Sequence, residues 1–422
     1  MEQIQQQDSL WTKHFIQIMI VAFMVSITMN MTMTTLPLYG QHIGGSRSLA
    51  GYITAIFTLS ALLFRPVFGT LLDNKGRKKV LVIGIFVFFL SVLSYNFAYL
   101  VSVLLFFRFI QGAGFSGHST AAGTIVADIV PVKRLAEGIG YFGVANTLGS
   151  AIGPSIGLYI IKYFDYNILF IISAIFSLTA LLIAYAINYE KEKQFVGQIF
   201  NKTKIKKEEI HKNQFEIKNE VRAGRERKVG IKVGLDNGIV AGIVIFEKSA
   251  LPTSLVLFFV ALTVGSIMTF IPIYALNKGI EDIGIFFIIY AFALLLTRIK
   301  MGKLVDRYGV TAVIIPGLMI GFIALIILAF AESLISFLIV AFLYGFSFAT
   351  VYPTLNATMV RLCPPLRRGA GNATFFSAMD IGVGLGSVIW GYISELFGFV
   401  YVYLGAAVCI IFALFFYFLM EK

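Results

Sequence analysis

Charged side chains are scarce in this chain. Only 13% of its 422 residues are charged, 58% are hydrophobic, and the mean hydropathy is +0.86. A soluble domain usually carries about a quarter charged residues, because its surface must face water. The apolar runs, such as 80–93 and 251–264, are continuous rather than alternating, which excludes a transmembrane barrel. The composition therefore predicts an all-α membrane protein, since helices satisfy their own backbone hydrogen bonds in lipid.

Residues that commonly carry chemistry are also few. The two cysteines, Cys363 and Cys409, have neither a disulfide framework nor zinc-site spacing. The four histidines are scattered, so they supply no cluster for an intramembrane enzyme. The chain has no phosphate-binding Gly-x4-Gly-Lys-Ser/Thr loop, so it does not hydrolyse ATP through such a loop. We expect no enzyme activity, no cofactor and no metal site.

The net charge of +12 is distributed unevenly. Most Lys and Arg residues lie in the N-terminal tail, in alternate loops, in the centre of the chain and at the C-terminus. This positive-inside bias predicts a multi-pass protein of the cell (inner or plasma) membrane with both termini in the cytoplasm. Nucleic-acid binding would need these charges on one folded face. The partners we expect are the lipid bilayer, a small-molecule substrate and protons, with the chain acting as a monomer and binding no nucleic acid.

Twelve apolar segments are long enough to cross a bilayer, which takes about 20 helical residues. A polar stretch at 189–250, with 14 Lys/Arg and 9 Asp/Glu, predicts a cytoplasmic linker between a six-helix bundle at 1–188 and another at 251–422. The first segment is long enough to span and follows a polar tail, so we do not read it as a signal peptide. The predicted spans are 14–39, 49–72, 79–99, 101–127, 136–162, 168–188, 251–276, 281–303, 311–331, 334–360, 370–396 and 400–420.

The two predicted bundles repeat one another. Gly69-Thr-Leu-Leu-Asp73 recurs 233 residues later as Gly302-Lys-Leu-Val-Asp306. Unrelated apolar helices would not keep a common register over several segments, so we expect parallel repeats with a transport pathway where they meet. The same offset pairs Arg65 with Arg298, Gly112 with Gly345, Gly138 with Gly371, Gly149 with Gly382 and Phe164 with Phe397.

Three motifs resemble those of a known family. The run 69–79, GTLLDNKGRKK, resembles the loop 2–3 signature of the major facilitator superfamily, and 302–309 resembles its weaker second copy. Arg108-Phe-Ile-Gln-Gly112 resembles the helix-4 motif, and 149–157 the helix-5 motif, of the twelve-helix drug:proton antiporters. The resemblance covers the chain except for the central linker. It implies the major facilitator fold and a secondary active, proton-coupled exporter that works by alternating access.

The loop motif is expected to form a gate. Gly69 allows close helix approach and Gly76 a tight turn, and the resemblance places Asp73 against the N-terminus of helix 11. Arg77 should then pair with an acid, for which Asp128 is the candidate. An ordinary charged loop that fixes topology is the alternative. The second copy keeps Gly302 and Asp306 but has Val310 and Thr311 in place of the basic run, which predicts a weaker latch.

The helix-5 motif places small residues on one helix face. Gly149, Gly153 and Gly157 recur every four residues, so backbones can approach there, and Pro154 removes one backbone donor. We expect a hinge that packs against helix 8 and biases the cycle toward export. Plain tight packing is the alternative.

Ionisable groups within apolar spans are costly and are therefore functional candidates. Arg108 with Gln111 matches the family position linked to proton transfer, and Asp380 is the carboxylate placed deepest in a span. Because burial disfavours the charged carboxylate, Asp380 is a candidate for binding and releasing a proton; the alternatives are a permanent cation partner or a capping role. His118 could also titrate or simply pack. Arg65 is expected to snorkel to the membrane boundary in a structural role.

A substrate cavity is implied between helices 1, 4, 7 and 10. Flexible thioethers and aromatic faces there would suit lipophilic, especially cationic, ligands, although packing alone could explain them. The candidates are Asn30, Met31, Phe115, Phe348, Tyr352 and Asn356.

Three function classes remain open. A proton-coupled exporter of small organic compounds fits the helix-5 motif best. The alternatives are an exporter or uptake symporter of one metabolite, such as a sugar, organic acid or metallophore, and a membrane receptor or scaffold that transports nothing.

Overall fold

The computed structural model describes residues 10–131, 134–189, 247–364 and 368–421. The described residues up to 187 and from 247 onward belong to one compact unit. The predicted linker therefore lies almost entirely outside the described residues. The account below concerns this unit.

The described chain forms twelve long helices, and the prediction of an all-α membrane protein is confirmed. The observed ends lie within a few residues of the predicted ones, since apolar runs and turn residues mark them directly. The first six helices are α2 (Lys13–His42), α3 (Arg47–Lys75), α4 (Arg77–Ser94), α5 (Val101–Ile129), α6 (Leu135–Tyr163) and α7 (Tyr166–Ala186). The last six are α9 (Leu251–Asn277), α10 (Gly284–Tyr308), α11 (Thr311–Ala329), α12 (Leu334–Leu362), α13 (Arg368–Leu396) and α14 (Phe399–Glu421). Two short 3₁₀ helices, η1 (Tyr95–Phe97) and η3 (Lys248–Ala250), flank α4 and α9.

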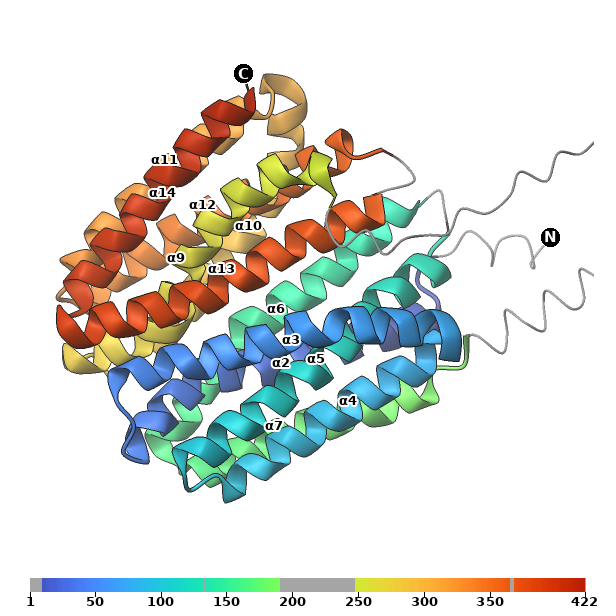
Figure 1. Ribbon diagram of the computed structural model, residues 1–422, viewed down its shortest axis with the longest axis horizontal. Coiled ribbons are helices and arrows are strands. Elements are labelled where there is room, and N and C mark those ends of the chain that lie inside the picture. The colour runs from blue at the N-terminus through green and yellow to red at the C-terminus, as the bar shows by residue number, and fades with distance from the viewer. Residues whose placement is uncertain (1–9, 132–133, 190–246, 365–367, 422) are drawn as a thin grey trace, which may run out of the picture. The chain divides into compact units, whose positions relative to one another are not determined.

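Ten of these helices are long and apolar enough to cross a membrane by length and composition. The polar residues Arg108, Gln111 and His118 lower the hydropathy of α5, and of α10 only the apolar part 284–297 and the last two residues have described side chains. Both helices still pack among the others in the ribbon (Figure 1). The three polar side chains of α5 are buried, so they are sheltered by protein rather than exposed to lipid.

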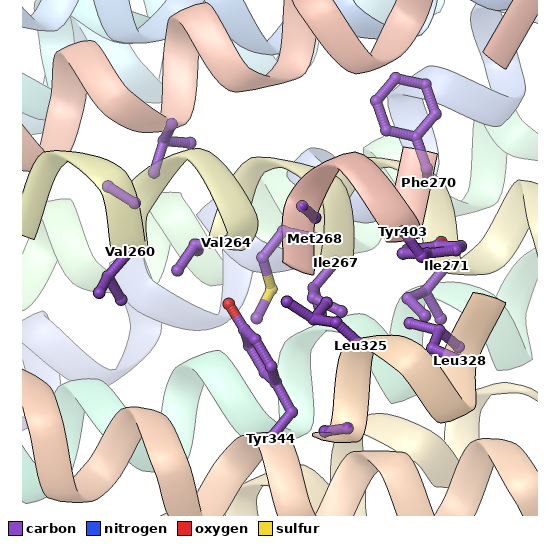
Figure 2. Close-up of a cluster of buried hydrophobic side chains, with 14 of the residues drawn as sticks. Val260, Val264, Ile267, Met268, Phe270, Ile271, Leu325, Leu328, Tyr344 and Tyr403 are labelled. Atoms are coloured by element: carbon purple, nitrogen blue, oxygen red, sulfur yellow. The ribbon is translucent and has the colours of Figure 1, made fainter. Parts of the chain in front are cut away.

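The core of the last six helices surrounds α9. Side chains of α9 pack against Leu325 and Leu328 of α11, Tyr344 of α12 and Tyr403 of α14 (Figure 2). The hydroxyls of Tyr344 and Thr263 are hydrogen bonded at 2.7 Å, so the buried phenol is satisfied within the core. The α9 side chains in this cluster are Val260, Val264, Ile267, Met268, Phe270 and Ile271.

Close helix packing relies on glycine at a few positions. A Cβ on Gly112 of α5 would meet the backbone carbonyl of Phe57 on α3, and one on Gly84 of α4 would meet the backbone of His118 on α5. Small residues are what allow such approach in membranes, where lipid supplies no hydrophobic drive for helix association. Their placement fixes how the first six helices pack.

The two sets of six helices meet mainly along two helix pairs, α3 with α13 and α6 with α10, while α2 and α3 also contact α9. The helices α3 and α13 lie side by side (Figure 1). A Cβ on Gly51 of α3 would meet the backbone of Ser387, and a Cβ on Gly384 of α13 would meet the Thr58 side chain. We call the end where α3 begins and α13 finishes the outer end, after the side that the charge bias predicts for it.

Candidate functional site

An ion pair joins the two sets of helices within their membrane-spanning segments, on the inner side of the middle of α3. Nη2 of Arg65 on α3 lies 2.7 Å from Oδ2 of Asp380, near the middle of α13. Both side chains are about a quarter exposed, at 23% and 24%. The pair is therefore partly reachable by solvent, yet it sits within segments that span the membrane.

The packing of α3 on α13 brings this pair together. Thr58, two turns before Arg65 on α3, lies against Gly384, one turn after Asp380 on α13. The helices run antiparallel, so successive residues on α3 face preceding residues on α13. Arg65 was expected to snorkel to the boundary; the structure instead pairs it with a carboxylate of the other six helices.

A second polar cluster surrounds Arg108 inside the first six helices. The Arg108 side chain is fully buried, its Nε donates to the Ile53 carbonyl at 3.2 Å, and its Nη1 donates to Gln111. The guanidinium carbon also lies 4.4 Å from the centroid of the Phe57 ring. Its Nη2 has no hydrogen-bond partner among the described residues. Neutral oxygens and an aromatic face thus solvate this cation.

Two members of the Arg108 cluster were missed from the sequence. The Tyr95 hydroxyl donates to Oε1 of Gln111 at 2.6 Å, and Nε2 of Gln111 donates to the Thr32 hydroxyl at 3.1 Å. Tyr95 is in η1 and Thr32 in α2, so neither is near the helix-4 motif in sequence. Their apolar surroundings in the sequence carry no signal of this role.

Two of the proton-coupling candidates, Arg108 and Asp380, lie apart. Arg108 contacts Phe57, whereas Asp380 pairs with Arg65, eight residues further along α3. Eight helical residues correspond to about 12 Å along the axis. Arg108 with Gln111 and Asp380 therefore belong to two separate polar sites, which contact the same helix, α3.

His118 joins neither site. It is 3% exposed, its backbone lies against Gly84 of α4, and its ring centroid is 6.3 Å from that of Phe115. Its Nδ1 has no hydrogen-bond partner among the described residues. This environment fits packing better than proton transfer, since the charged imidazolium would have no acceptor there.

The expected partner of Arg77 is observed. Helix α4 begins at Arg77, directly after Gly76 with a φ of 90°, and the Arg77 guanidinium pairs with the Asp128 carboxylate at the end of α5. Gly69, expected at a close helix contact, has no neighbour within 4 Å of a Cβ built on it. The side chains of Asp73 and Asp306, and the surroundings of Gly302, lie outside the described part.

The glycine face of the helix-5 motif lies on α6 and packs against α2. The expected contact was with the eighth span, which is α10. A Cβ on Gly149 would meet Ser26, one on Gly153 would meet the Ile27 carbonyl, and one on Gly157 would meet Thr35. The reason is geometric: residues four apart form one stripe, and that stripe faces α2 while the opposite side of α6 faces α10. Pro154 lies within α6.

The contact of α6 with α10, the eighth span, is made by other residues of α6. The Ser155 hydroxyl donates to the carbonyl of Gly284, the first residue of α10, at 2.8 Å. At the outer end Nζ of Lys162 lies 2.6 Å from Asp282 and 3.5 Å from Glu281. These contacts close the α6–α10 side of the outer end.

The α3–α13 side of the outer end is closed as well. The backbone N–H of Ser48 donates to Oε2 of Glu395 at 3.1 Å, and the hydroxyls of Tyr52 and Tyr392 are hydrogen bonded. From there the described polar contacts between α3 and α13 extend inward to Arg65 and Asp380. The first six and the last six helices are thus in contact on both sides of the outer end.

The candidate cavity residues are only partly brought together. Phe348 and Tyr352 stack on α12 with centroids 5.3 Å apart, and Tyr352 continues to Phe375 of α13 at 6.0 Å. Phe115 instead packs on Phe57, with centroids 5.5 Å apart. Met31 is fully buried and adjoins Gly153 of α6, so it does not line an open space.

The two amide candidates are half-buried. The side-chain nitrogen of Asn30 donates to the Ser26 carbonyl one turn earlier, at 2.8 Å. Asn356 lies one turn beyond Tyr352 on α12. Asn30 therefore has its acceptor within its own helix.

This arrangement defines a polytopic membrane transporter: twelve helices, two intramembrane polar sites and a junction between two sets of six. The Major Facilitator Superfamily model matches residues 18–246 and 253–422, so the chain belongs to that family. Members of this family are secondary transporters rather than enzymes.

Two curated relatives span nearly the whole chain. The chain is 24% identical over 377 residues to a staphylopine export protein of Staphylococcus aureus, covering 87% of this chain and 86% of that protein. It is 25% identical over 401 residues to a multi-drug resistance efflux pump PmrA homolog of Lactococcus lactis, covering 91% and 90%. Both relatives are named as exporters.

A solved structure shares the fold. The bacterial homolog of the human lysosomal transporter Spinster, in an inward-facing and occupied conformation, aligns with a TM-score of 0.72 and 14% identity. The alignment covers 96% of each chain. It supports the fold alone.

Proposed function

We propose that this protein is a secondary active exporter that exchanges small organic compounds for protons by alternating access. The observation that carries the proposal is the Arg65–Asp380 ion pair, a proton-binding group placed where the two sets of helices meet. A transporter that couples two fluxes needs such a group at the moving junction.

The moving parts would be residues 1–188 and 251–422, rocking against each other. The outer end is closed at Lys162–Asp282 and at Tyr52–Tyr392 in this structure. With the termini in the cytoplasm, this corresponds to a state closed to the outside. Opening outward would have to break these contacts.

The inner gate is assigned to the loop motif. Arg77 and Asp128 fix the start of α4 on the end of α5 at the opposite end of the helices from the outer contacts. Both side chains belong to adjacent helices of one set. The pair would therefore keep the motif loop in position for its contact with the eleventh span, α13.

The substrate region is proposed along α12. The stacked rings of Phe348 and Tyr352, continued by Phe375, offer flat apolar surfaces to an organic ligand. Aromatic faces also attract cations. Lipophilic and cationic compounds fit this combination best.

Transport into everted vesicles under an imposed pH gradient tests the proposal. Proton-driven accumulation of a compound from a drug panel should occur with the wild-type protein and disappear with Asp380→Asn. Lys278→Gln is the matched control, because Lys278 pairs with Glu332 within the last six helices. The coupling role is contradicted if Asp380→Asn keeps gradient-driven export. If no tested compound shows a flux that depends on the pH gradient, the result favours a receptor or scaffold instead.

Export of a single metabolite is the second candidate. It is favoured by the similarity to the staphylopine export protein, which covers 86% of that protein. The width of the substrate range separates the two candidates. Knockout cells hypersensitive to many unrelated compounds indicate a drug exporter, whereas accumulation of one cellular compound inside unstressed knockout cells indicates a dedicated exporter.

A further inference from the structure

We propose that Arg65 is the positioning residue that times proton binding at Asp380: the pair excludes a proton while the outer end is closed, and Asp380 takes one up only after α3 and α13 separate. This inference rests on the proposed function. It assigns to Arg65 a role in coupling that the sequence did not indicate.

The position of the pair makes it sensitive to outward opening. Arg65 belongs to the first six helices and Asp380 to the last six. Above them, toward the outer end, the same two helices are joined at Thr58–Gly384, then at Tyr52–Tyr392, then at Ser48–Glu395. Opening of the outer end parts these contacts, and a rotation whose axis lies on the inner side of Arg65 and Asp380 parts the ion pair as well.

The glycines of α13 hold Asp380 toward α3. A Cβ on Gly382 would meet Ala261 and one on Gly386 would meet Leu262, both on α9, whereas one on Gly384 would meet Thr58 on α3. Helix α13 thus packs closely against α9 on one face and against α3 on another. The carboxylate has little freedom to seek another partner while this packing holds.

The other charges near α13 are remote along its axis. Of the described helices packed on it, α9 has no charged residue in 251–277, and α12 carries one, Arg361, in its last turn. Glu247, beside η3, donates its backbone N–H to Thr374, six residues or about 9 Å before Asp380. On α13 itself Glu395 lies at the outer end, and on α14 Glu421 is the last helical residue. Arg65 is therefore the cation described in contact with Asp380.

The physical consequence is a proton switch. A carboxylate inside a span keeps its negative charge when a guanidinium neutralises it, and loses that support when the guanidinium moves away. After outward opening, a proton from outer water binds a carboxylate oxygen of Asp380. On closing, Arg65 returns, the oxygen–hydrogen bond breaks, and the proton leaves to water on the inner side. One proton thus crosses inward in each cycle.

Comparison of the two repeated halves indicates that this switch exists between α3 and α13 and not between α6 and α10. The position equivalent to Asp380 is Thr147 on α6, which cannot carry a charge. Its hydroxyl donates to the Gly143 carbonyl in its own helix. The ion pair described between α6 and its partners is instead at the outer end, at Lys162. The α3–α13 pair therefore has a carboxylate on the helix where the α6–α10 pair has the neutral Thr147.

Cross-linking across the outer end tests the proposal without a known substrate. Tyr52→Cys and Tyr392→Cys, in a chain whose Cys363 and Cys409 are replaced by serine, report closure with a short thiol cross-linker. In reconstituted vesicles the cross-linking yield should fall as the outside pH is lowered, because a proton binds Asp380 in the outward-open form and so favours that form. Arg65→Gln should abolish this pH dependence, and Arg65→Lys should retain it.

Matched controls keep the outcome interpretable. Lys278→Gln removes one cation from a pair within the last six helices and should leave the pH dependence unchanged. In transport, Arg65→Gln should lower proton-driven export by about tenfold or more, while counterflow at equal pH is retained. A wild-type pH profile in Arg65→Gln, or loss of the profile in Arg65→Lys, would overturn the proposal.

The two proposals can fail separately. If no compound is exported by the wild-type protein, the proposed function fails, yet the cross-linking still shows whether Arg65 and protons govern closure. If export is proton-driven and Arg65→Gln keeps its pH dependence, only the assignment of Arg65 fails.

Discussion

The guanidinium carbon of Arg108 lies 4.4 Å from the centroid of the Phe57 ring. The rest of its environment is made of neutral oxygens from α3, α2 and α5. A buried cation solvated in this way depends on the directions of several N–H groups at once. Its geometry is therefore a sensitive point of the structure.

Replacing Arg108 by Lys should impair export strongly although the charge is kept. Lysine has one ammonium in place of the planar fork, so it cannot reach both the Ile53 carbonyl and Gln111. We expect at least about a tenfold loss of transport rate, or roughly 1.4 kcal/mol. Initial rates in vesicles measure it. Arg47→Lys, at the first residue of α3, is the comparison; an equal loss in both variants would contradict a specific role for Arg108.

Tyr95→Phe should destabilise the Arg108 cluster. The change removes the hydroxyl that donates to Gln111 at 2.6 Å and leaves that oxygen with one donor fewer. We expect a loss of about 1 kcal/mol in stability, seen as a lower melting temperature in detergent. Tyr99→Phe is the matched control, because Tyr99 is 70% exposed. Equal melting temperatures for both variants would show that the Tyr95 hydroxyl contributes nothing.

Gly153→Ala should disturb the packing of α6 on α2. The added methyl would lie 2.6 Å from the Ile27 carbonyl oxygen, so the helices must shift apart. Overpacking of this kind costs about 1–3 kcal/mol. Gly140→Ala in the same helix is the control: it has no neighbour within 4 Å and gains helix propensity. The packing assignment is wrong if Gly153→Ala is as stable as Gly140→Ala in thermal unfolding.

Arg77 and Asp128 should show measurable coupling in a double-mutant cycle. Their side chains are 37% and 16% exposed, so solvent screens part of the attraction and we expect about 1 kcal/mol. Arg77→Gln, Asp128→Asn and the double variant would be compared by melting temperature and by export rate. Strictly additive effects would mean that the contact seen here contributes no energy.

Salt should loosen the outer end. Lys162 pairs with Asp282 and Glu281, both more than half exposed, so ions in solution can screen this attraction. Thiol cross-linking between α3 and α13 should therefore decrease at high salt in the wild type, and this decrease should be smaller in Lys162→Gln. An identical salt response in both proteins would remove Lys162 from the outer closure.

The sequence by itself determined the membrane class, the twelve helices and the family. Apolar length sets a span directly, and charges and turn residues set its ends, so these features need no knowledge of neighbours. The pairing of Arg77 with Asp128 could also be anticipated, because both lie at adjacent helix ends on one side.

Only the tertiary structure decided which spans touch and what each buried polar group meets. The glycine stripe at Gly149, Gly153 and Gly157 was recognisable in the sequence, but its partner α2 was not, since any helix can accept such a face. Arg65 and Asp380 are 315 residues apart in the chain and became partners only because α3 and α13 pack antiparallel. A one-dimensional pattern records that a charge is buried; the packing of the helices decides which opposite charge it meets.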